Sequence, residues 1–86
     1  MSQWNVYILR CADGTLYTGI TNDLPKRIER HAVGTGAKYT RGRGPVVLVY
    51  SRVMRTATAA RKREYAIKQL TRSEKLALIA NIQAKR

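Results

Sequence analysis

The sequence predicts an α+β fold, a small sheet with helices packed on it in the order β-β-α-β-α-α. Two β-rich segments, 4–11 and 15–21, flank an Asp13-Gly14 turn, and a β-branched run spans 45–53. Helix-capping residues followed by apolar residues at helical spacing predict helices before and after that third strand. A chain of 86 residues has room for one core, so we expect a single domain over residues 1–86.

The turn between the first two strands allows two registers, which place the tyrosines differently. With a two-residue loop, Tyr7 and Tyr17 point to opposite faces of the sheet. With a three-residue loop that ends in a left-handed Gly14, Tyr7 lies opposite Gly19 and shares a face with Tyr17. Both loops accept a glycine at this position, so the residues favour the second register only slightly.

The first helix has a clear start and a clear end. Asp23 is its expected N-cap and Pro25 lies in its first turn. We expect the helix to run to about Ala32, before Gly34 and Gly36 stop it.

Two further helices follow the third strand. Thr56 or Thr58 opens the second, which is predicted to continue to about Leu70. Thr71 and Glu74 have the spacing of a capping box for the third, expected over about 72–84. The third helix is predicted to be apolar at Leu76, Ile79 and Ala80.

The apolar stripe expected on the first helix contains two residues whose side chains could take part in catalysis. Leu24, Arg27, Ile28 and His31 recur at helical spacing. Taken alone, Arg27 reads as an arginine that snorkels from the edge of the stripe, and His31 as a histidine that ends the helix.

Glu64 lies inside the apolar stripe of the second helix. Ala57, Ala60, Ile67 and Leu70 form that stripe. A carboxylate in a buried stripe is costly unless it is paired or binds a cation. An ion pair with Arg27 or Lys68 and a metal site are therefore the two interpretations, and the residues do not decide between them.

The chain carries a large positive charge. Seventeen Lys and Arg against five Asp and Glu give a net charge of +12. Such an excess favours a polyanionic partner, with nucleic acid ahead of anionic membranes or ribosomal surfaces. The lone Cys11 cannot form an internal disulfide, and no apolar run is long enough to cross a bilayer. We therefore expect a cytoplasmic protein, with association with the nucleoid as an open alternative, and a monomer by default.

The motifs resemble those of the GIY-YIG nuclease superfamily, and most closely its short, single-domain bacterial UPF0213 group. Asn5-Val6-Tyr7 and Tyr17-Thr18-Gly19 are similar to the paired motifs of that name. Arg27, His31 and Glu64 follow in the order and at the spacing of the arginine, histidine and glutamate of the family. The resemblance covers about residues 4–70.

The resemblance implies a three-stranded antiparallel sheet flanked by helices, with both tyrosines on one face. It therefore implies the three-residue loop. It also implies divalent-metal-dependent hydrolysis of a DNA phosphodiester, selective for structure more than for sequence, with DNA repair or recombination as the setting.

Each site residue can then be given a role. Glu64 would hold one Mg²⁺ or Mn²⁺, and Arg27 would grip a phosphate oxygen. Tyr7 would deprotonate water, Tyr17 would position water and phosphate, and His31 would relay a proton; the roles of the two tyrosines could be reversed. Because tyrosine ionises near pH 10, Tyr7 would need cationic neighbours to lower its pKa.

The glycine-rich loop 34–44 is the expected nucleic-acid contact, since glycines let the backbone approach phosphates. Its contact residues would be Lys38, Tyr39, Arg41 and Arg43, on duplex, branched or single-stranded DNA. The alternative is a catalytically weak or inactive binding module for DNA or RNA. It is favoured because Asn81 does not match the asparagine that many family members carry after the glutamate, and because no further DNA-binding domain is expected.

Overall fold

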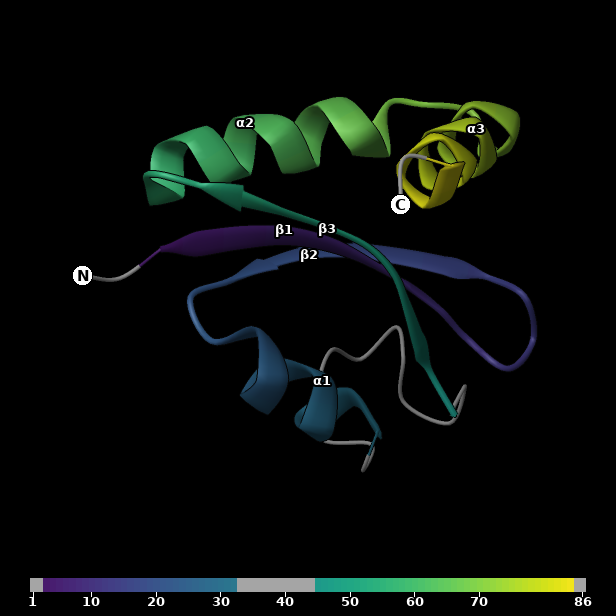
Figure 1. Cartoon of the computed structure of the whole chain (residues 1–86), viewed down its shortest axis with the longest axis horizontal. Helices are drawn as coiled ribbons and strands as arrows, with labels where there is room; N and C mark the ends of the chain where they lie inside the picture. The colour runs from purple at the N-terminus through teal and green to yellow at the C-terminus, as the bar shows by residue number, and fades with distance from the viewer. Residues whose placement is uncertain (1–2, 33–44, 85–86) are drawn as a thin grey trace.

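A computed structural model describes residues 3–32 and 45–84 of the chain, with only the backbone described for 82–84. The elements follow the predicted order β-β-α-β-α-α, so the α+β prediction is confirmed. They are β1 (Trp4–Arg10), β2 (Leu16–Thr21), α1 (Leu24–Ala32), β3 (Val47–Met54), α2 (Ala57–Lys68) and α3 (Arg72–Ala84). Figure 1 shows the sheet as a middle layer, with α1 on one face and both α2 and α3 on the other.

The sheet is antiparallel, with strand order β2-β1-β3, so β1 lies in the centre. Tyr7 pairs with Gly19 and Leu9 pairs with Tyr17. This is the register of the three-residue loop, and it places Tyr7 and Tyr17 on the same face because opposed residues share a face.

The turn itself has the geometry that this register requires. The backbone N–H of Cys11 donates to the carbonyl of Thr15 at 2.9 Å, and the N–H of Gly14 donates to the carbonyl of Cys11 at 2.9 Å. Gly14 has φ of +85°, a conformation that glycine adopts without strain. Nη2 of Arg72, at the start of α3, donates to the carbonyl of Gly14 at 2.9 Å and ties the turn to that helix.

The central strand is buried on both faces. Val6 and Ile8 contribute to the hydrophobic core on the α2 and α3 side, with Ala60, Ile67 and Ile79. The alternate residues of β1, Tyr7 and Leu9, point to the α1 side and are also fully buried. The strand that carries the first motif is thus held rigidly between two layers.

The helix starts follow the predicted caps. Oδ1 of Asp23 accepts from the N–H of Lys26 at 3.3 Å, and the Thr56 side chain accepts from the N–H of Ala59 at 3.0 Å. At α3, Glu74 accepts from the N–H of Thr71 at 2.8 Å while Thr71 accepts from the N–H of Glu74 at 3.2 Å. This exchange is the predicted capping box.

The predicted apolar stripe of α3 was partly wrong. Ile79 is buried, but Leu76 is exposed and Ala80 is exposed. Leu78 and Lys75 are half-buried instead, because α3 meets the rest of the fold along a line rotated from the predicted one. A half-buried lysine can cover apolar surface with its methylene stem while its ammonium stays in solvent.

The third strand begins two residues later than predicted and is an edge strand. Its pairing with β1 shifts between Ile8 and Leu9, which leaves Val49 without a partner as a bulge. Tyr50 is its one buried residue and belongs to the core. Across the described residues, every helix is too short or too polar to cross a membrane.

Candidate active site

Four of the five predicted catalytic residues meet on the α1 side of the sheet. Tyr7 comes from β1, Tyr17 from β2, and both Arg27 and His31 from α1. Arg27 and His31 are one helical turn apart, so both side chains reach the same part of the sheet. We call these four residues the tyrosine cluster.

The Tyr7 hydroxyl is the centre of the tyrosine cluster. Its Oη lies 3.0 Å from Nε2 of His31 and accepts a hydrogen bond from Nε of Arg27 at 3.4 Å. Arginine can only donate, so the phenolic proton is available for His31. The arrangement favours a neutral imidazole with its proton on Nδ1, which accepts at Nε2 from the tyrosine.

The three rings pack against one another. The centroids of Tyr17 and His31 are 5.1 Å apart, and those of Tyr7 and His31 are 6.0 Å apart with the rings edge to face. The Tyr7 and Tyr17 centroids are 6.2 Å apart. These separations are those of favourable aromatic pairs, so packing as well as hydrogen bonding orients the tyrosine cluster.

Gly19 makes this packing possible. A Cβ at this position would lie 2.7 Å from Oη and 2.9 Å from Cζ of Tyr7, and 3.0 Å from Cε2 of Tyr17. The two tyrosine rings thus occupy the space that a side chain would need. The glycine of the second motif therefore has a steric role in the site.

Burial dominates the electrostatics of Tyr7. Loss of solvation raises the pKa of its hydroxyl above the ordinary value, although the hydrogen bond from Arg27 acts in the opposite direction. Arg27 thus lowers this pKa as expected, but burial outweighs it. Tyr7 is a neutral phenol at neutral pH in the protein alone.

The pKa of His31 is lowered, whereas that of Arg27 is raised. Burial, followed by the repulsion of Arg27, lowers the pKa of His31, so its imidazole is neutral at pH 7. The hydrogen bond to Tyr7 is the main cause that raises the pKa of Arg27, with a smaller contribution from Tyr17. His31 does lie in the last turn of its helix, as expected, and its side chain is only 1% exposed.

Glu64, the fifth predicted catalytic residue, contacts Lys68, which lines a surface pocket together with Tyr17 of the tyrosine cluster. It is on α2, which covers the other face of the sheet (Figure 1). Its Oε2 is 3.3 Å from Nζ of Lys68, with side chains 23% and 52% exposed respectively. The ion pair with Lys68, one of the expected alternatives, is thus present. Such a solvent-exposed pair contributes only about 0.2–1 kcal/mol to stability.

The predicted metal site has one carboxylate to offer. Within residues 3–32 and 45–84, no three His, Cys, Asp or Glu side chains gather into a metal-binding group. Mg²⁺ often keeps most of its waters and uses one or two carboxylates together with substrate phosphates. The half-buried, weakly paired carboxylate of Glu64 fits that kind of ligand set.

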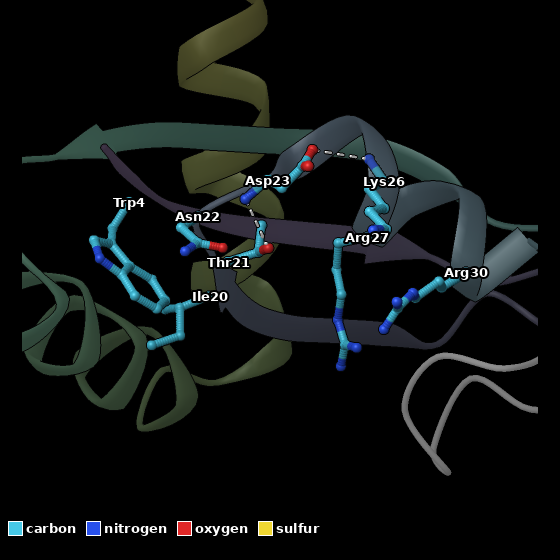
Figure 2. Close-up of a pocket in the computed structure, with 8 residues that line it drawn as sticks. All are labelled: Trp4, Ile20, Thr21, Asn22, Asp23, Lys26, Arg27 and Arg30. Carbon is cyan, nitrogen blue, oxygen red and sulfur yellow. Dashed lines mark hydrogen bonds between the residues drawn. The ribbon is translucent and has the colours of Figure 1, made fainter. Parts of the chain in front are cut away.

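The predicted nucleic-acid contacts Lys38, Tyr39, Arg41 and Arg43 lie outside the described residues. The structure instead shows a basic cleft that sequence analysis missed. Trp4, Lys26 and Arg30 line it together with Arg27 (Figure 2). No sequence pattern signals it, because it forms only when the start of β1, the end of β2 and the start of α1 are brought together.

The fold and motifs are those of a known catalytic domain. The GIY-YIG catalytic domain family matches residues 3–77. A UPF0213 protein of Clostridium perfringens is 59% identical over 88% of this chain and 82% of its own length. A UPF0213 protein of Oceanobacillus iheyensis is 54% identical over 90% of each chain.

Solved structures agree with this assignment. The solution NMR structure of a UPF0213 protein from Bacillus halodurans is 47% identical with a TM-score of 0.60, over 91% of this chain and 83% of that one. The solution NMR structure of an E. faecalis protein is 34% identical with a TM-score of 0.64, over 96% and 90%. The chain therefore belongs to the GIY-YIG family and, within it, to the UPF0213 group.

Proposed function

We propose that this chain is a divalent-metal-dependent DNA endonuclease that hydrolyses phosphodiester bonds. The observation that carries the proposal is the position of the Tyr7 hydroxyl between the guanidinium of Arg27 and the neutral imidazole of His31. A buried phenol joined to a proton acceptor and a permanent cation is a costly arrangement for stability alone. It suits the transfer of a proton beside a phosphate.

The proton pathway follows from the pKa directions. Tyr7 keeps its proton at neutral pH, and the neutral imidazole of His31 can accept one. As an attacking water loses its proton to Oη of Tyr7, the phenolic proton passes to Nε2 of His31. Tyr7 therefore does not need to ionise before the reaction, and His31 is the final proton acceptor.

Arg27 and Tyr17 would position the phosphate. Nε of Arg27 is directed at Tyr7, and its guanidinium also borders the basic cleft. A phosphate oxygen bound there would lie close to the Tyr7 hydroxyl. The fixed charge of Arg27 would stabilise the negative charge that grows on the phosphate oxygens.

Glu64 would hold the metal ion, Mg²⁺ or Mn²⁺. The ion would supply a positive charge beside the scissile phosphate and the leaving oxygen. Glu64 would have to exchange its weak contact with Lys68 for the ion, which an open ion pair permits. The phosphate of the bound DNA would complete the site, so tight metal binding without DNA is not expected.

DNA binding would rest on the net charge of +12 and on contacts to phosphates. Lys38, Tyr39, Arg41 and Arg43 are the proposed loop contacts. Selectivity for DNA structure, a role in repair or recombination, and a cytoplasmic or nucleoid location complete the proposal.

A second candidate function is a nucleic-acid-binding module with weak or no cleavage. The observation that favours it is the ion pair of Glu64 with Lys68, which occupies the carboxylate that would have to hold the metal. Asn81 lies on α3 and lines a pocket with Arg63 of α2 and Leu78 of α3.

The test is cleavage of a panel of end-labelled duplex, branched and single-stranded DNAs in Mg²⁺, Mn²⁺ or EDTA. Wild type is expected to cut with either metal, and Glu64→Gln to lose cutting while it retains DNA binding. Glu74→Gln is the matched control, since Glu74 is an exposed carboxylate whose bonds are to Thr71. Binding without cutting by all three proteins would support the second candidate.

A further inference from the structure

A cleft of about 410 Å³ opens beside the tyrosine cluster, where β1 begins and the chain leaves β2 for α1. Figure 2 shows Trp4 and Ile20 on one side, and Arg27 and Arg30 on the other. The residues that line it are Trp4, Ile20, Thr21, Asn22, Asp23, Lys26, Arg27 and Arg30. Its walls thus combine an aromatic plane with a cationic rim.

Trp4 is held in place as a platform. It is the first residue of β1, and its half-buried indole packs partly against the hydrophobic core. The remaining part of the ring lines the cleft beside Ile20. An indole fixed in this way can stack on a flat ligand with little loss of side-chain entropy.

The opposite wall carries three cations from α1, Lys26, Arg27 and Arg30. One carboxylate, that of Asp23, also lines the cleft, and it accepts a hydrogen bond from the backbone N–H of Lys26 as the helix cap. The cleft therefore has a net positive charge and a flat apolar surface, which together match a nucleotide: a phosphate for the cations and a base for the indole.

Arg27 belongs to both the cleft and the tyrosine cluster. Its Nε donates to Tyr7, while the residue also forms part of the cleft wall. If the scissile phosphate contacts Arg27, the neighbouring nucleotide enters the cleft. This step rests on the proposed nuclease function, whereas binding of a nucleotide in the cleft does not require cleavage.

We propose that this cleft is a subsite for the DNA nucleotide next to the scissile phosphate, with its base stacked on Trp4 and its phosphate held by Lys26 and Arg30. A paired base is already stacked between its neighbours and cannot reach an indole at the side of the duplex. The subsite therefore takes an unpaired base. It makes DNA with single-stranded nucleotides at the cut the preferred substrate class.

The chain has one tryptophan, so its fluorescence reports on the cleft alone. Wild type is titrated in EDTA with oligothymidylate, and with an oligomer of equal length and charge that consists of abasic sites. Stacking predicts quenching of Trp4 by oligothymidylate only, and affinity about 5- to 150-fold higher than for the abasic oligomer. Equal affinities with unchanged emission would overturn the subsite, as would an oligouridylate affinity tenfold above that for oligothymidylate.

Variants separate the platform from general DNA binding. Trp4→Leu is expected to bind oligothymidylate no better than the abasic oligomer, and Trp4→Phe to recover much of the difference. Tyr65→Leu is the matched control, because Tyr65 is an exposed aromatic on α2 and is 67% exposed. Circular dichroism verifies that each variant is folded. Full discrimination between the oligomers by folded Trp4→Leu would overturn the assignment, whether or not wild type cleaves DNA.

Discussion

Nε2 of His31 lies 3.0 Å from the hydroxyl of Tyr7, and both side chains are almost completely buried. They come from positions 24 residues apart, on β1 and α1, and they are joined across the layer between sheet and helix. Because burial keeps both groups neutral, the pair can pass a proton without either group first becoming charged.

The stability of the protein should depend on pH through His31, the single histidine. Its folded-state pKa lies below the ordinary 6.5, so the unfolded chain binds a proton more readily than the folded protein. Stability is therefore full above pH 6.5 and falls as the pH drops from there towards the folded pKa.

This pH dependence can be measured by thermal unfolding of wild type and His31→Gln between pH 5 and about 8. The variant is expected to be less stable at neutral pH and to have a flatter profile. Parallel profiles for the two proteins would show that His31 titrates equally in both states and would contradict the burial argument.

The pH dependence of cleavage distinguishes a neutral Tyr7 from a tyrosinate base. If neutral His31 is the final acceptor, the rate falls only below pH 6.5 and is nearly level above it, since the pKa of Tyr7 lies above 10. If ionised Tyr7 were the base, the rate would rise about tenfold per pH unit through the neutral range. Single-turnover rates from pH 5.5 to about 9 at saturating metal decide between them.

Replacement of Gly19 should damage activity more than stability. A Cβ at Gly19 would lie 2.7 Å from the Tyr7 hydroxyl, so Gly19→Ala must displace the Tyr7 ring. The expected loss in free energy of unfolding is about 1–3 kcal/mol, with cleavage reduced by about 100-fold because the Tyr7 hydroxyl is misplaced.

Gly14→Ala is the matched control for that experiment. Gly14 has positive φ, and an added Cβ meets nothing within 4 Å. This variant should lose about 1–2 kcal/mol of stability from backbone strain and retain its rate per folded molecule. Similar activities for the two variants would argue against a steric role of Gly19 in the site.

Removal of Lys68 should release Glu64 for metal binding. Lys68→Met abolishes the 3.3 Å ion pair and leaves stability within about 0.5 kcal/mol, since the lysine is largely exposed. The metal concentration for half-maximal cleavage at saturating DNA is expected to fall by about 2- to 5-fold, the worth of a weak ion pair. Lys62→Met, on the same helix, serves as the control, and an equal change in both variants would mean that Glu64 is not the metal ligand.

Local patterns predicted most of the fold. Asp23, Thr56 and Thr71 fixed the helix starts because a cap depends only on residues within one turn. The apolar stripe of α3 was misassigned because the structure buries part of Lys75 and exposes its neighbour Leu76. That choice depends on tertiary packing, which a single helix does not encode.

The residues of the tyrosine cluster could be predicted from the sequence, but the direction of the Tyr7 pKa shift could not. Resemblance gave the residues of the tyrosine cluster, but the net pKa shift of Tyr7 depends on burial by both layers, which outweighs Arg27. The cleft beside Trp4 is formed by residues of three different segments, so no local sequence pattern predicts it. The Glu64–Lys68 pair was one of the contacts that the sequence left open, and the structure shows that it forms.

The most direct test of the proposed mechanism is single-turnover cleavage of branched DNA in Mg²⁺ by wild type and Tyr7→Phe. The variant keeps the ring that packs against Gly19 and loses only the hydroxyl shared by Arg27 and His31. We predict Mg²⁺-dependent cutting by wild type, and a rate about 100- to 10,000-fold lower for the variant with DNA affinity unchanged. Equal rates for the two proteins would contradict the account.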